Sequence, residues 1–398
     1  MYKPLVIALV GDYGYIKQIE TTIKSIIYHN HDCKIYVINP DIPQEWFFLA
    51  NQRLAIIHCK IIDKKILPKT LAKEFAFLDQ VSVVAYAKFL LPRLLSDSRV
   101  LYLDSDVIVN NSLTQLFYQD LQGHPLAAVE DYDEHNGHFN SGVLLLDLDH
   151  LRRIPNFVSQ ALKLGQDRSL KNADQDVFNH FFKDDYLALP LADNYQIGMD
   201  SIAYYHSKIK PYLLPKLDSV TQPVITHFLT IHKPWKDFSS GRLRELWWQY
   251  YGLSWEDAVY NRPLPLTQPN LYKRFFTFLM TEETGRLVDL AKACPQYEFN
   301  VATWVPVGPK IHKLLQYPNI HVYEHIVGRQ IEELVKHCDA YLDVDCPVKE
   351  HHVLKQFAQH QTPFLAFANV ADHYHHYPNY RVFDDDDLQG FIDALKQI

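Results

Sequence analysis

The sequence has few cysteines, and none of them lie close together. Five occur among 398 residues, and no two form a Cys-x-x-Cys pair. They are Cys33, Cys59, Cys294, Cys338 and Cys346. This spacing argues against both a disulfide framework and a structural zinc site. Isolated cysteines are typical of proteins in a reducing compartment, and we therefore expect the chain to be cytoplasmic.

Long apolar runs and an excess of positive charge are also missing. No stretch approaches the roughly 18 apolar residues of a membrane span, so we expect no transmembrane segment. The apolar run Leu5–Val10 is too short for the core of a signal peptide. With 39 basic and 47 acidic residues, the formal net charge is −8. A negative surface repels phosphate backbones, which argues against a general nucleic-acid-binding protein.

Apolar runs and helical patterns alternate along the first part of the chain. The expected strands are Leu5–Val10, Lys34–Ile38, Leu54–Cys59 and Val100–Leu103, and the expected helices are Ile16–Ile27, Pro43–Arg53 and Ser82–Leu95. This alternation predicts an α/β fold in which helices flank a doubly wound sheet. Ligands of such sheets bind beyond the carboxyl ends of the strands.

A proline-rich segment separates a second α/β region from the first. Asn261–Pro269 holds three prolines in nine residues, which favours an extended linker. Strands are expected again at Tyr297–Thr303, Asn319–Tyr323, Ala340–Val344 and Pro363–Phe367, followed by a helix at Leu388–Lys396. We expect a main domain at 1–260, a linker at 261–270 and a smaller α/β accessory domain at 271–398.

Two carboxylates follow the expected strand Val100–Leu103. Asp104 and Asp106 are two residues apart and are flanked by apolar residues. They repel each other unless a cation lies between them, and a hard divalent ion such as Mn²⁺ or Mg²⁺ suits oxygen ligands. The same pattern recurs at Asp343 and Asp345, again after an expected strand. The pattern alone therefore leaves both pairs open as metal sites.

Three further polar motifs follow in order along the chain. Asn140 and Ser141 precede a buried strand, Asp174 and Gln175 open a helix, and His227 lies six residues ahead of Lys233. With Asp104-x-Asp106, these motifs resemble those of glycosyltransferase family 8 over about residues 4–250. The resemblance implies a GT-A fold, a Rossmann-like mixed sheet flanked by helices. It also implies metal-dependent, retaining transfer from a nucleotide sugar.

The resemblance further implies a role for each matching residue. The implied metal ligands are Asp104, Asp106 and His227. The implied donor-binding residues are Asp12, Tyr15, Lys88, Asp104, Ser105, Asn140, Ser141 and Lys233. Among them, Asp12 and Tyr15 would hold the uracil and Lys233 the diphosphate. The implied catalytic residues beside the reacting sugar are Gln175, Asp174 and Asp131.

Two residues depart from the family pattern. Lys88 stands where an arginine is common over the donor, so the charge is kept but the bidentate fork is lost. Thr230 stands where many members have a glycine in the loop before Lys233. Structural interpretations of single residues stay open as well. Asp12 can cap the helix that follows it, and Tyr15 can be a packing residue.

The resemblance implies transfer of galactose or glucose from a UDP-sugar to a hydroxyl of a glycan or glycoprotein. Two alternatives are kept. One is a catalytically silent sugar-binding or chaperone subunit of a glycosylation complex. The other is a sugar nucleotidyltransferase, which needs a glycine-rich, basic phosphate loop after the first strand. Gly11–Gly14 offers the glycines but no basic residue.

The last part of the chain bears a looser resemblance. Residues 271–398 are similar to the appended domain of enzymes that extend O-glycans on serine-rich-repeat adhesins of Gram-positive bacteria. This implies an acceptor of that kind. Since the segment has no glycine-rich phosphate loop, we expect it to serve the acceptor or to stabilise the first domain. A histidine-rich loop, His373–Tyr377, is expected at its surface. Homo-oligomers and complex partners are left open.

Overall fold

The computed structural model divides into two compact units. The first contains residues 1–229 and 245–265, and the second contains residues 230–244 and 266–398. The structure describes residues 4–66, 84–131, 137–167, 169–170, 172–198, 211–229, 233–235, 243–265, 273–304, 306–324, 326, 328–372 and 376–398. The expected linker, 261–270, lies partly outside these ranges. Within them, no helix has both the length and the apolar character to cross a membrane.

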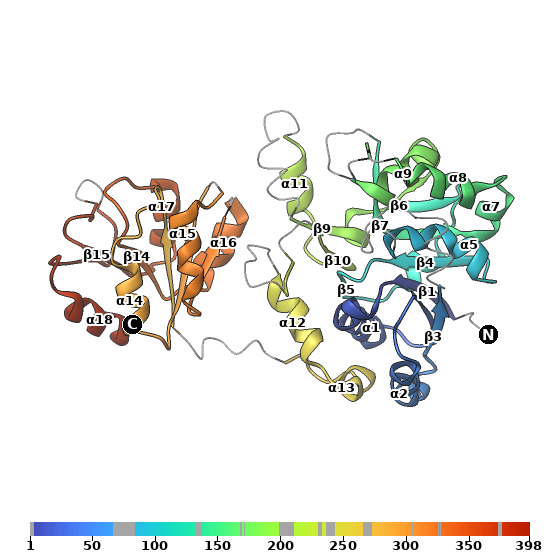
Figure 1. Ribbon diagram of the computed structural model, residues 1–398, viewed down its shortest axis with the longest axis horizontal. Helices are drawn as coiled ribbons and strands as arrows, with labels where there is room; N and C mark the ends of the chain where they lie inside the picture. Colours follow the sequence, from blue (N-terminus) through green and yellow to red (C-terminus); the bar gives the residue numbers. More distant parts are fainter. Residues whose placement is uncertain are drawn as a thin grey trace. The chain divides into compact units, whose positions relative to one another are not determined.

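A seven-stranded mixed sheet forms the centre of the first unit (Figure 1). Its order is β3-β2-β1-β4-β7-β6-β8, and β7 runs antiparallel to both of its neighbours. The strands are β1 (Leu5–Val10), β2 (Cys33–Asn39), β3 (Lys60–Lys65), β4 (Arg99–Leu103), β6 (Leu126–Glu130), β7 (Phe139–Asp147) and β8 (Leu187–Ala188). All residues of β1 are buried, which explains its continuous apolar run. The expected α/β class is confirmed.

Helices connect the strands of the first unit. They are α1 (Ile16–His29), α2 (Gln44–Leu54), α5 (Leu91–Leu94), α6 (Thr114–Tyr118), α7 (Leu148–Arg153), α8 (Phe157–Leu164), α9 (Ala173–Phe182), α11 (Leu213–Asp218), α12 (Arg244–Gly252) and α13 (Trp255–Val259). Short 3₁₀ helices are η1 (Tyr13–Tyr15), η2 (Ala55–Ile57), η3 (Tyr86–Leu90) and η4 (Leu191–Asn194). In α1, Ile19, Ile23 and Ile26 are buried at helical spacing, so one face of this helix packs into the core.

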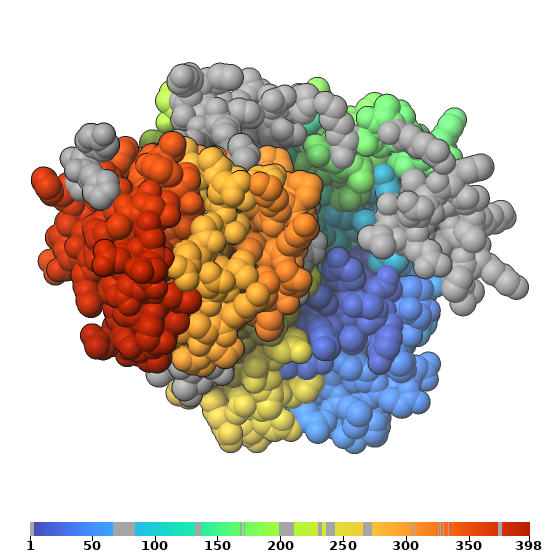
Figure 2. Space-filling model, turned by 60° about the vertical axis from the view of Figure 1, so that its left-hand side comes forward, coloured from blue at the N-terminus to red at the C-terminus, as the bar shows by residue number. Residues whose placement is uncertain are grey.

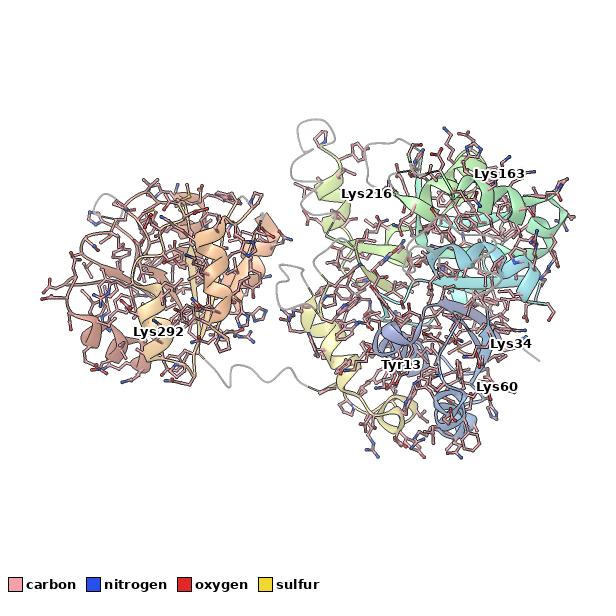
Figure 3. All side chains as sticks on the ribbon, viewed as in Figure 1. Tyr13, Lys34, Lys60, Lys163, Lys216 and Lys292 are labelled. Carbon is pink, nitrogen blue, oxygen red and sulfur yellow. The ribbon has the colours of Figure 1, made fainter. Side chains whose placement is uncertain are left out.

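The expected strand Leu54–Cys59 is wrong. Leu54 ends α2 and the next residues form η2, while the third strand is β3, at Lys60–Lys65. The apolar run in this segment comes from the buried end of a helix, where Leu54 and Ile57 face the core. The true strand lies at the edge of the sheet and carries charged residues such as Lys60, labelled in Figure 3. Charged side chains are common on edge strands, so β3 lacks the signature of a buried strand.

The expected helix Ser82–Leu95 is helical throughout its described part up to Leu94, but it is not one regular α-helix. Residues 84–85 are α-helical and are followed by η3 and then by α5. Pro92 lies in the first turn of α5. Proline has no N–H to donate to a preceding turn and is favoured at helix starts, so it begins a new helix at this point. Ser82 lies outside the described residues.

Helices α12 and α13 pack against the amino-terminal helices. The hydroxyl of Tyr250 lies 2.8 Å from Nε2 of His29 at the end of α1. The hydroxyl of Tyr28 donates to the carbonyl of Arg262 at 2.8 Å. Helix α13 contacts both α1 and α2, and Figure 2 shows its yellow surface bordering the blue surface of the first residues. The end of the first unit is therefore built onto its beginning.

A small second sheet extends the first unit beyond the carboxyl end of β4. Its order is β5-β10-β9, with β5 (Val107–Val109), β9 (Tyr195–Ile197) and β10 (Ile225–Phe228). Strand β10 runs antiparallel to β5 and parallel to β9. Because His227 is paired with Val107 in this register, the histidine lies directly beside the Asp104-x-Asp106 turn.

The second unit is a smaller α/β layer structure. Six parallel strands have the order β13-β12-β11-β14-β15-β16. They are β11 (Arg274–Phe278), β12 (Glu298–Ala302), β13 (Ile320–Tyr323), β14 (Ala340–Asp343), β15 (Phe364–Phe367) and β16 (Tyr380–Phe383). The helices are α14 (Leu287–Ala293), α15 (Pro309–His312), η5 (Lys313–Gln316), α16 (Gly328–Lys336), α17 (His351–Gln359) and α18 (Leu388–Gln397). Separate apolar clusters lie around Phe391 and around Phe357. The four expected strands and the last helix are confirmed, while β11 and β16 were not anticipated.

Asp193 in η4 makes the stability of the first unit depend on pH. Burial raises the pKa of its carboxyl group to about 6. The folded state therefore binds this proton more tightly than the unfolded chain, and the stability that the proton contributes is lost as the pH rises through about 6. We expect Asp193→Asn to raise the midpoint of thermal unfolding at pH 7.5 by on the order of 2–4 °C, and to leave it unchanged near pH 4. Thermal unfolding by circular dichroism at both pH values, with the exposed Asp184→Asn as control, checks this. An equal shift at both pH values would contradict it.

Candidate metal and donor site

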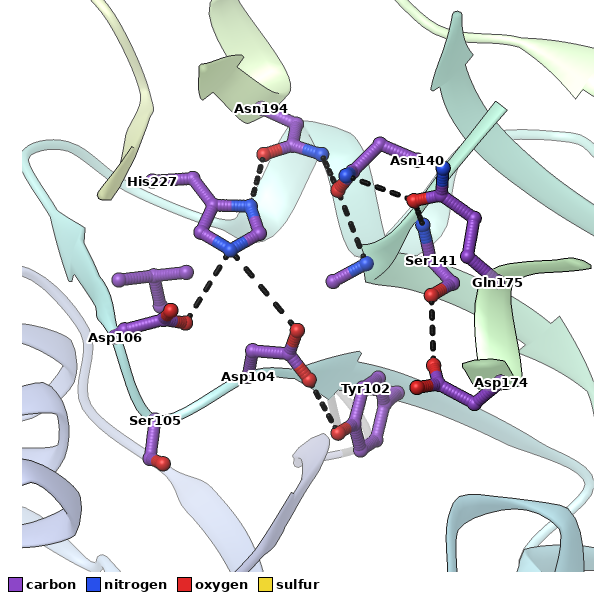
Figure 4. A network of polar contacts seen from close by, with 12 residues as sticks. Tyr102, Asp104, Ser105, Asp106, Asn140, Ser141, Asp174, Gln175, Asn194 and His227 are labelled. Atoms are coloured by element: carbon purple, nitrogen blue, oxygen red, sulfur yellow. Dashed lines mark hydrogen bonds and ion pairs between the residues drawn. The ribbon is translucent and has the colours of Figure 1, made fainter. Parts of the chain in front are cut away.

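Three ligand atoms meet at the end of β4. One oxygen each of Asp104 and Asp106 and one ring nitrogen of His227 lie within 4.8 Å of one another. Nε2 of His227 lies 3.2 Å from Oδ1 of Asp106 and 3.9 Å from Oδ2 of Asp104 (Figure 4). Two carboxylates and an imidazole are a donor set that suits Mn²⁺ or Mg²⁺. The structure thus brings together the three residues expected as metal ligands.

The backbone holds this turn in place. The N–H of Asp104 donates to the carbonyl of Gly142 at 2.8 Å, and the N–H of Phe228 donates to the carbonyl of Asp106 at 3.0 Å. The hydroxyl of Thr22 in α1 lies 2.8 Å from the carbonyl oxygen of Val107 and 3.0 Å from that of Ser105, and its single proton is shared between them. In Figure 4 the Ser105 side chain points away from His227.

Gly142 leaves the space in which the ligand atoms converge. A Cβ atom at this position would lie 2.1 Å from Cε1 of His227 and 2.7 Å from Oδ2 of Asp104. Any side chain would therefore displace the imidazole or the carboxylate. A cradle that only glycine permits, lined by two carboxylates and an imidazole, fits a bound divalent ion.

Lys88 supplies a buried positive charge beside the cluster. Its ammonium group lies 2.5 Å from Oδ2 of Asp174 and 3.6 Å from Oδ1 of Asp104, and its side chain is 2% exposed. Burial lowers the pKa of Lys88, but Asp104 and Asp174 outweigh this effect and the net pKa is raised. The lysine is therefore charged and connects the expected metal ligand Asp104 to the expected catalytic residue Asp174.

Tyr102 completes the surroundings of Asp104. Its hydroxyl donates to Oδ1 of Asp104 at 2.5 Å. Burial, with the nearby Asp104 carboxylate adding to it, raises the pKa of Tyr102 far above its usual value. The phenol thus stays protonated and is a permanent donor to the carboxylate. This contact directs the second oxygen, Oδ2, toward His227.

A chain of amide side chains continues from His227. Oδ1 of Asn194 lies 3.0 Å from Nδ1 of His227, and Nδ2 of Asn194 donates to Oδ1 of Asn140 at 2.8 Å. Nδ2 of Asn140 donates to Oε1 of Gln175 at 3.0 Å, and Nε2 of Gln175 donates to Asp131. Figure 4 shows the part of this chain from His227 to Gln175. The structure therefore joins the expected metal ligands to the residues expected beside the sugar.

The hydroxyl of Ser141 contacts the other expected catalytic carboxylate. It donates to Oδ2 of Asp174 at 2.9 Å, and the carbonyl of Ser141 accepts from Lys88 at 3.2 Å. Helix α9 carries both Asp174 and Gln175 in its first turn. Since Asn140 and Ser141 are adjacent on β7, this strand and helix hold four of the expected residues together.

Comparisons with known proteins identify the family. Residues 6–239, more than half of the chain, match the family model described as Glycosyl transferase family 8. The chain belongs to glycosyl transferase family 8. Residues 278–398 of this family 8 protein match a second model, described as the GftB/GlyA-F C-terminal domain. Both resemblances expected from the sequence are thereby confirmed.

Individual relatives agree with the family. Glycosyltransferase GlyD of Streptococcus pneumoniae serotype 4 is 33% identical over 98% of this chain. The chain spans about half the length of GlyD and GlyA, 48% and 56%. The crystal structure of glycosyltransferase GlyE from S. pneumoniae TIGR4 matches with a TM-score of 0.57 and 28% identity, over 100% of this chain and 99% of GlyE. The galactosyltransferase LgtC, 24% identical, matches with a TM-score of 0.53 over 62% of this chain and 95% of its own. The GT-A type of the family 8 domain is confirmed.

The residues expected at the uracil lie at the end of β1. The carboxylate of Asp12 caps η1 by accepting from the N–H of Tyr15 at 3.2 Å. Tyr15 is 42% exposed and Tyr13, labelled in Figure 3, is 55% exposed. Capping by Asp12 is thus observed, and Tyr15 is not a core residue. Both are placed where a ligand could reach them.

Other expected residues of the family pattern are not placed at the cluster. Lys233 belongs to the segment 230–244, which is grouped with the second unit, so its contact with a donor diphosphate stays a prediction. Thr230 lies outside the described residues, as do His373 and His375.

The competing pair, Asp343 and Asp345, is buried in the second unit. Asp343 forms an ion pair with Lys349 and accepts a hydrogen bond from the hydroxyl of Tyr380. Asp345 lies 3.4 Å from the same lysine. Burial raises the pKa of Asp343 to about 6. Among the described residues, only Asp104, Asp106 and His227 form a metal-binding group, so the lysine four residues after Asp345 gives this pair a structural explanation.

Sequence motifs missed Asn194. It lies 33 positions before His227, and its neighbours form no charged or repeated pattern. Only its position before the short strand β9, which pairs with β10, connects it to the histidine. That pairing is a tertiary feature, and the sequence alone carries no signal for it.

Proposed function

We propose that the chain is a retaining, metal-dependent hexosyltransferase. It transfers galactose or glucose from a UDP-sugar to a hydroxyl of a glycan or glycoprotein. The observation that carries this proposal is the convergence of Asp104, Asp106 and His227 beside the chain of polar residues from Asn140 to Asp131. Membership of family 8 supports the use of a nucleotide sugar.

Different residues are proposed to bind the diphosphate and the uracil of the donor. Mn²⁺, or Mg²⁺, held by Asp104, Asp106 and His227 would neutralise charge on the diphosphate. Tyr15 offers its exposed ring to the uracil, and Asp12 its carboxylate. Lys233 adds a second positive charge to the diphosphate.

Residues beside the amide chain would orient the sugar. Asn140 and Gln175 are held by each other and by Asp131, so their orientation is fixed before the donor binds. Lys88 forms an ion pair with Asp174 and holds its carboxylate close to the cluster. A fixed negative charge at Asp174 stabilises positive charge that develops on the sugar as its bond to UDP breaks.

Retention is proposed to proceed by attack from the face that UDP leaves. Oδ2 of Asp174 already contacts both Lys88 and Ser141, which makes it a poor nucleophile. The amide of Gln175 is also a poor nucleophile. The acceptor hydroxyl therefore bonds to the sugar carbon as the bond to the phosphate oxygen breaks, and the departing phosphate accepts the hydroxyl proton.

The acceptor is proposed to be a glycan or glycoprotein, such as an O-glycan on a serine-rich surface adhesin. The match of residues 278–398 to the GftB/GlyA-F C-terminal domain supports this proposal. Since the chain spans about half of GlyD, the substrates of the whole protein are part of the proposal. All five cysteines are free, which supports a cytoplasmic site of action.

A panel of nucleotide sugars tests the activity. We expect UDP release from UDP-glucose or UDP-galactose with Mn²⁺, and a loss of at least about 10²-fold with a chelator, because the diphosphate charge is then not neutralised. UDP release is measured with a coupled assay, and Mn²⁺ added back after chelation is the control.

Each alternative gives a different result in the same panel. A silent sugar-binding subunit binds a UDP-sugar, detected by calorimetry, but releases no UDP. A nucleotidyltransferase forms UTP from a UDP-sugar and pyrophosphate. Full UDP release in chelator, with absence of metal verified by elemental analysis, contradicts metal dependence.

A further inference from the structure

Asn194 connects the two halves of the candidate site. We propose that it is a positioning residue that holds His227 in the tautomer protonated at Nδ1 and couples the metal ligands to the sugar-side residues. The proposal rests on the proposed metal site. The Asn194 side chain is fully buried at the end of η4, and its oxygen and its nitrogen each have a partner.

A backbone N–H determines which atoms donate and which accept in the first part of the hydrogen-bonded chain of side-chain amides. The N–H of Gly142 donates to Oδ1 of Asn140 at 3.0 Å, and a backbone N–H can only donate. The side-chain atom of Asn140 at this point must therefore be its oxygen. Asn194 also contacts this oxygen, at 2.8 Å, and must present its NH₂ group. The other end of the Asn194 amide, which faces His227, is then its oxygen.

This orientation determines the tautomer of His227. The Asn194 oxygen accepts but cannot donate, so Nδ1 of His227, 3.0 Å away, must carry the proton. Nε2 then presents its lone pair toward Asp104 and Asp106. In the opposite tautomer, Nε2–H would occupy the space of the ion. Hydrogen bonds to the second ring nitrogen fix metal-binding histidines in this way.

A second backbone N–H determines the donors and acceptors in the rest of this hydrogen-bonded chain of amides. The N–H of Ser141 donates to Oε1 of Gln175 at 3.3 Å, so the Gln175 NH₂ group faces Asp131. Every side-chain amide between His227 and Asp131 thus has a fixed orientation. Because Asn140 bonds to both Asn194 and Gln175, a shift of the histidine is transmitted to the residues beside the sugar.

The tautomer can be read directly in the metal-free wild-type protein. Long-range ¹H–¹⁵N correlation spectra of ¹⁵N-histidine-labelled protein distinguish a protonated from an unprotonated ring nitrogen. A His227→Gln sample identifies the signals. We expect Nδ1 of His227 to be protonated, because it faces the Asn194 oxygen. Nε2 faces two carboxylates in the metal-free protein, so a second proton on Nε2 leaves the proposal intact. Protonation at Nε2 alone would overturn the proposal without any variant of Asn194.

Substitution of Asn194 tests its positioning role. In Asn194→Leu, we expect a mixture of tautomers and an Mn²⁺ dissociation constant that rises about 10–100-fold, measured from the electron paramagnetic resonance signal of free Mn²⁺. The control is Asn30→Leu. Asn30 is buried, and it also donates one bond and accepts another, to Ile26 and Leu113. Even if Asn30→Leu loses as much unfolding free energy as Asn194→Leu, we expect its His227 tautomer and its Mn²⁺ dissociation constant to stay as in wild type. Unchanged tautomer and affinity in Asn194→Leu overturns the proposal.

Asn194→Asp tests the contact with His227 and the contact with Asn140 separately. It also provides the test if Asn194→Leu does not fold. Its carboxylate still accepts from Nδ1 of His227 but has no proton to donate to Asn140. We expect the wild-type tautomer, Mn²⁺ affinity close to wild type and a lower kcat. A kcat equal to wild type would overturn the coupling. If wild type binds no Mn²⁺ but shows the expected tautomer, the metal-dependent function fails while the assignment of the tautomer stands.

Discussion

Asp106→Asn should lower UDP-sugar turnover by at least about 10²-fold and leave the chain folded. The substitution keeps the size of the side chain but removes the negative charge from an atom 3.2 Å from Nε2 of His227. A neutral amide oxygen is a weaker ligand for a hard divalent ion than a carboxylate oxygen. Coupled UDP-release assays at several Mn²⁺ concentrations measure the loss, and circular dichroism verifies the fold.

The matched control is Asp345→Asn in the second unit. Asp345 belongs to the other candidate Asp-x-Asp pair but lies next to Lys349. UDP release per folded molecule should stay close to wild type, even if the second unit loses stability. If instead Asp345→Asn abolishes turnover and Asp106→Asn does not, the metal site has been assigned to the wrong Asp-x-Asp pair. The proposed donor site is then wrong as well.

Lys88→Met should reduce both stability and turnover. The ammonium group is buried between Asp104 and Asp174, and its removal leaves two carboxylates without their shared cation. Loss of one partner from a buried ion pair commonly costs about 3–5 kcal/mol of unfolding free energy. Since Mn²⁺ would supply positive charge to Asp104, we expect it to restore part of this loss. Urea unfolding with and without Mn²⁺ measures both effects.

Lys88→Arg is the control for charge. It keeps a cation at the same position and should lose less stability than Lys88→Met, because the carboxylates keep a partner. An unfolding free energy of Lys88→Met equal to that of wild type would mean that Lys88 does not balance these carboxylates. No gain from Mn²⁺ in Lys88→Met would mean that the ion does not bind next to Asp104.

Several buried strands were predictable because their sequence pattern follows directly from burial, although the buried strand β11 was not anticipated. β1 is covered on both faces, so it reads as an unbroken apolar run. β3 was misplaced because it is an edge strand with lysines, while the apolar end of α2 precedes it. β16 is also an edge strand and was missed for the same reason. Edge strands are specified by their neighbours in the sheet and carry little local signal.

The residues of the candidate site also differ in how far the sequence predicts them. Asp104 and Asp106 were found because two carboxylates in one short turn raise a local electrostatic problem. His227 and the Asn140–Ser141 pair were found by resemblance. Asn194 has partners 33 and 54 positions away, and its contribution exists only after β9 has paired with β10. The role of Lys349 beside Asp345 was readable from the four-residue spacing but was overlooked.

The packing of α12 and α13 onto α1 has a consequence for synthesis on the ribosome. Tyr28 bonds to a residue 234 positions later, and His29 to one 221 positions later. Synthesis proceeds at about 5–20 residues per second, so these partners leave the exit tunnel roughly 10–50 s after the amino-terminal helix. During that interval the face of α1 that they later cover is open to chaperones and to other nascent chains. We therefore expect codon choice and translational pausing before residue 262 to affect the folding yield of the first unit.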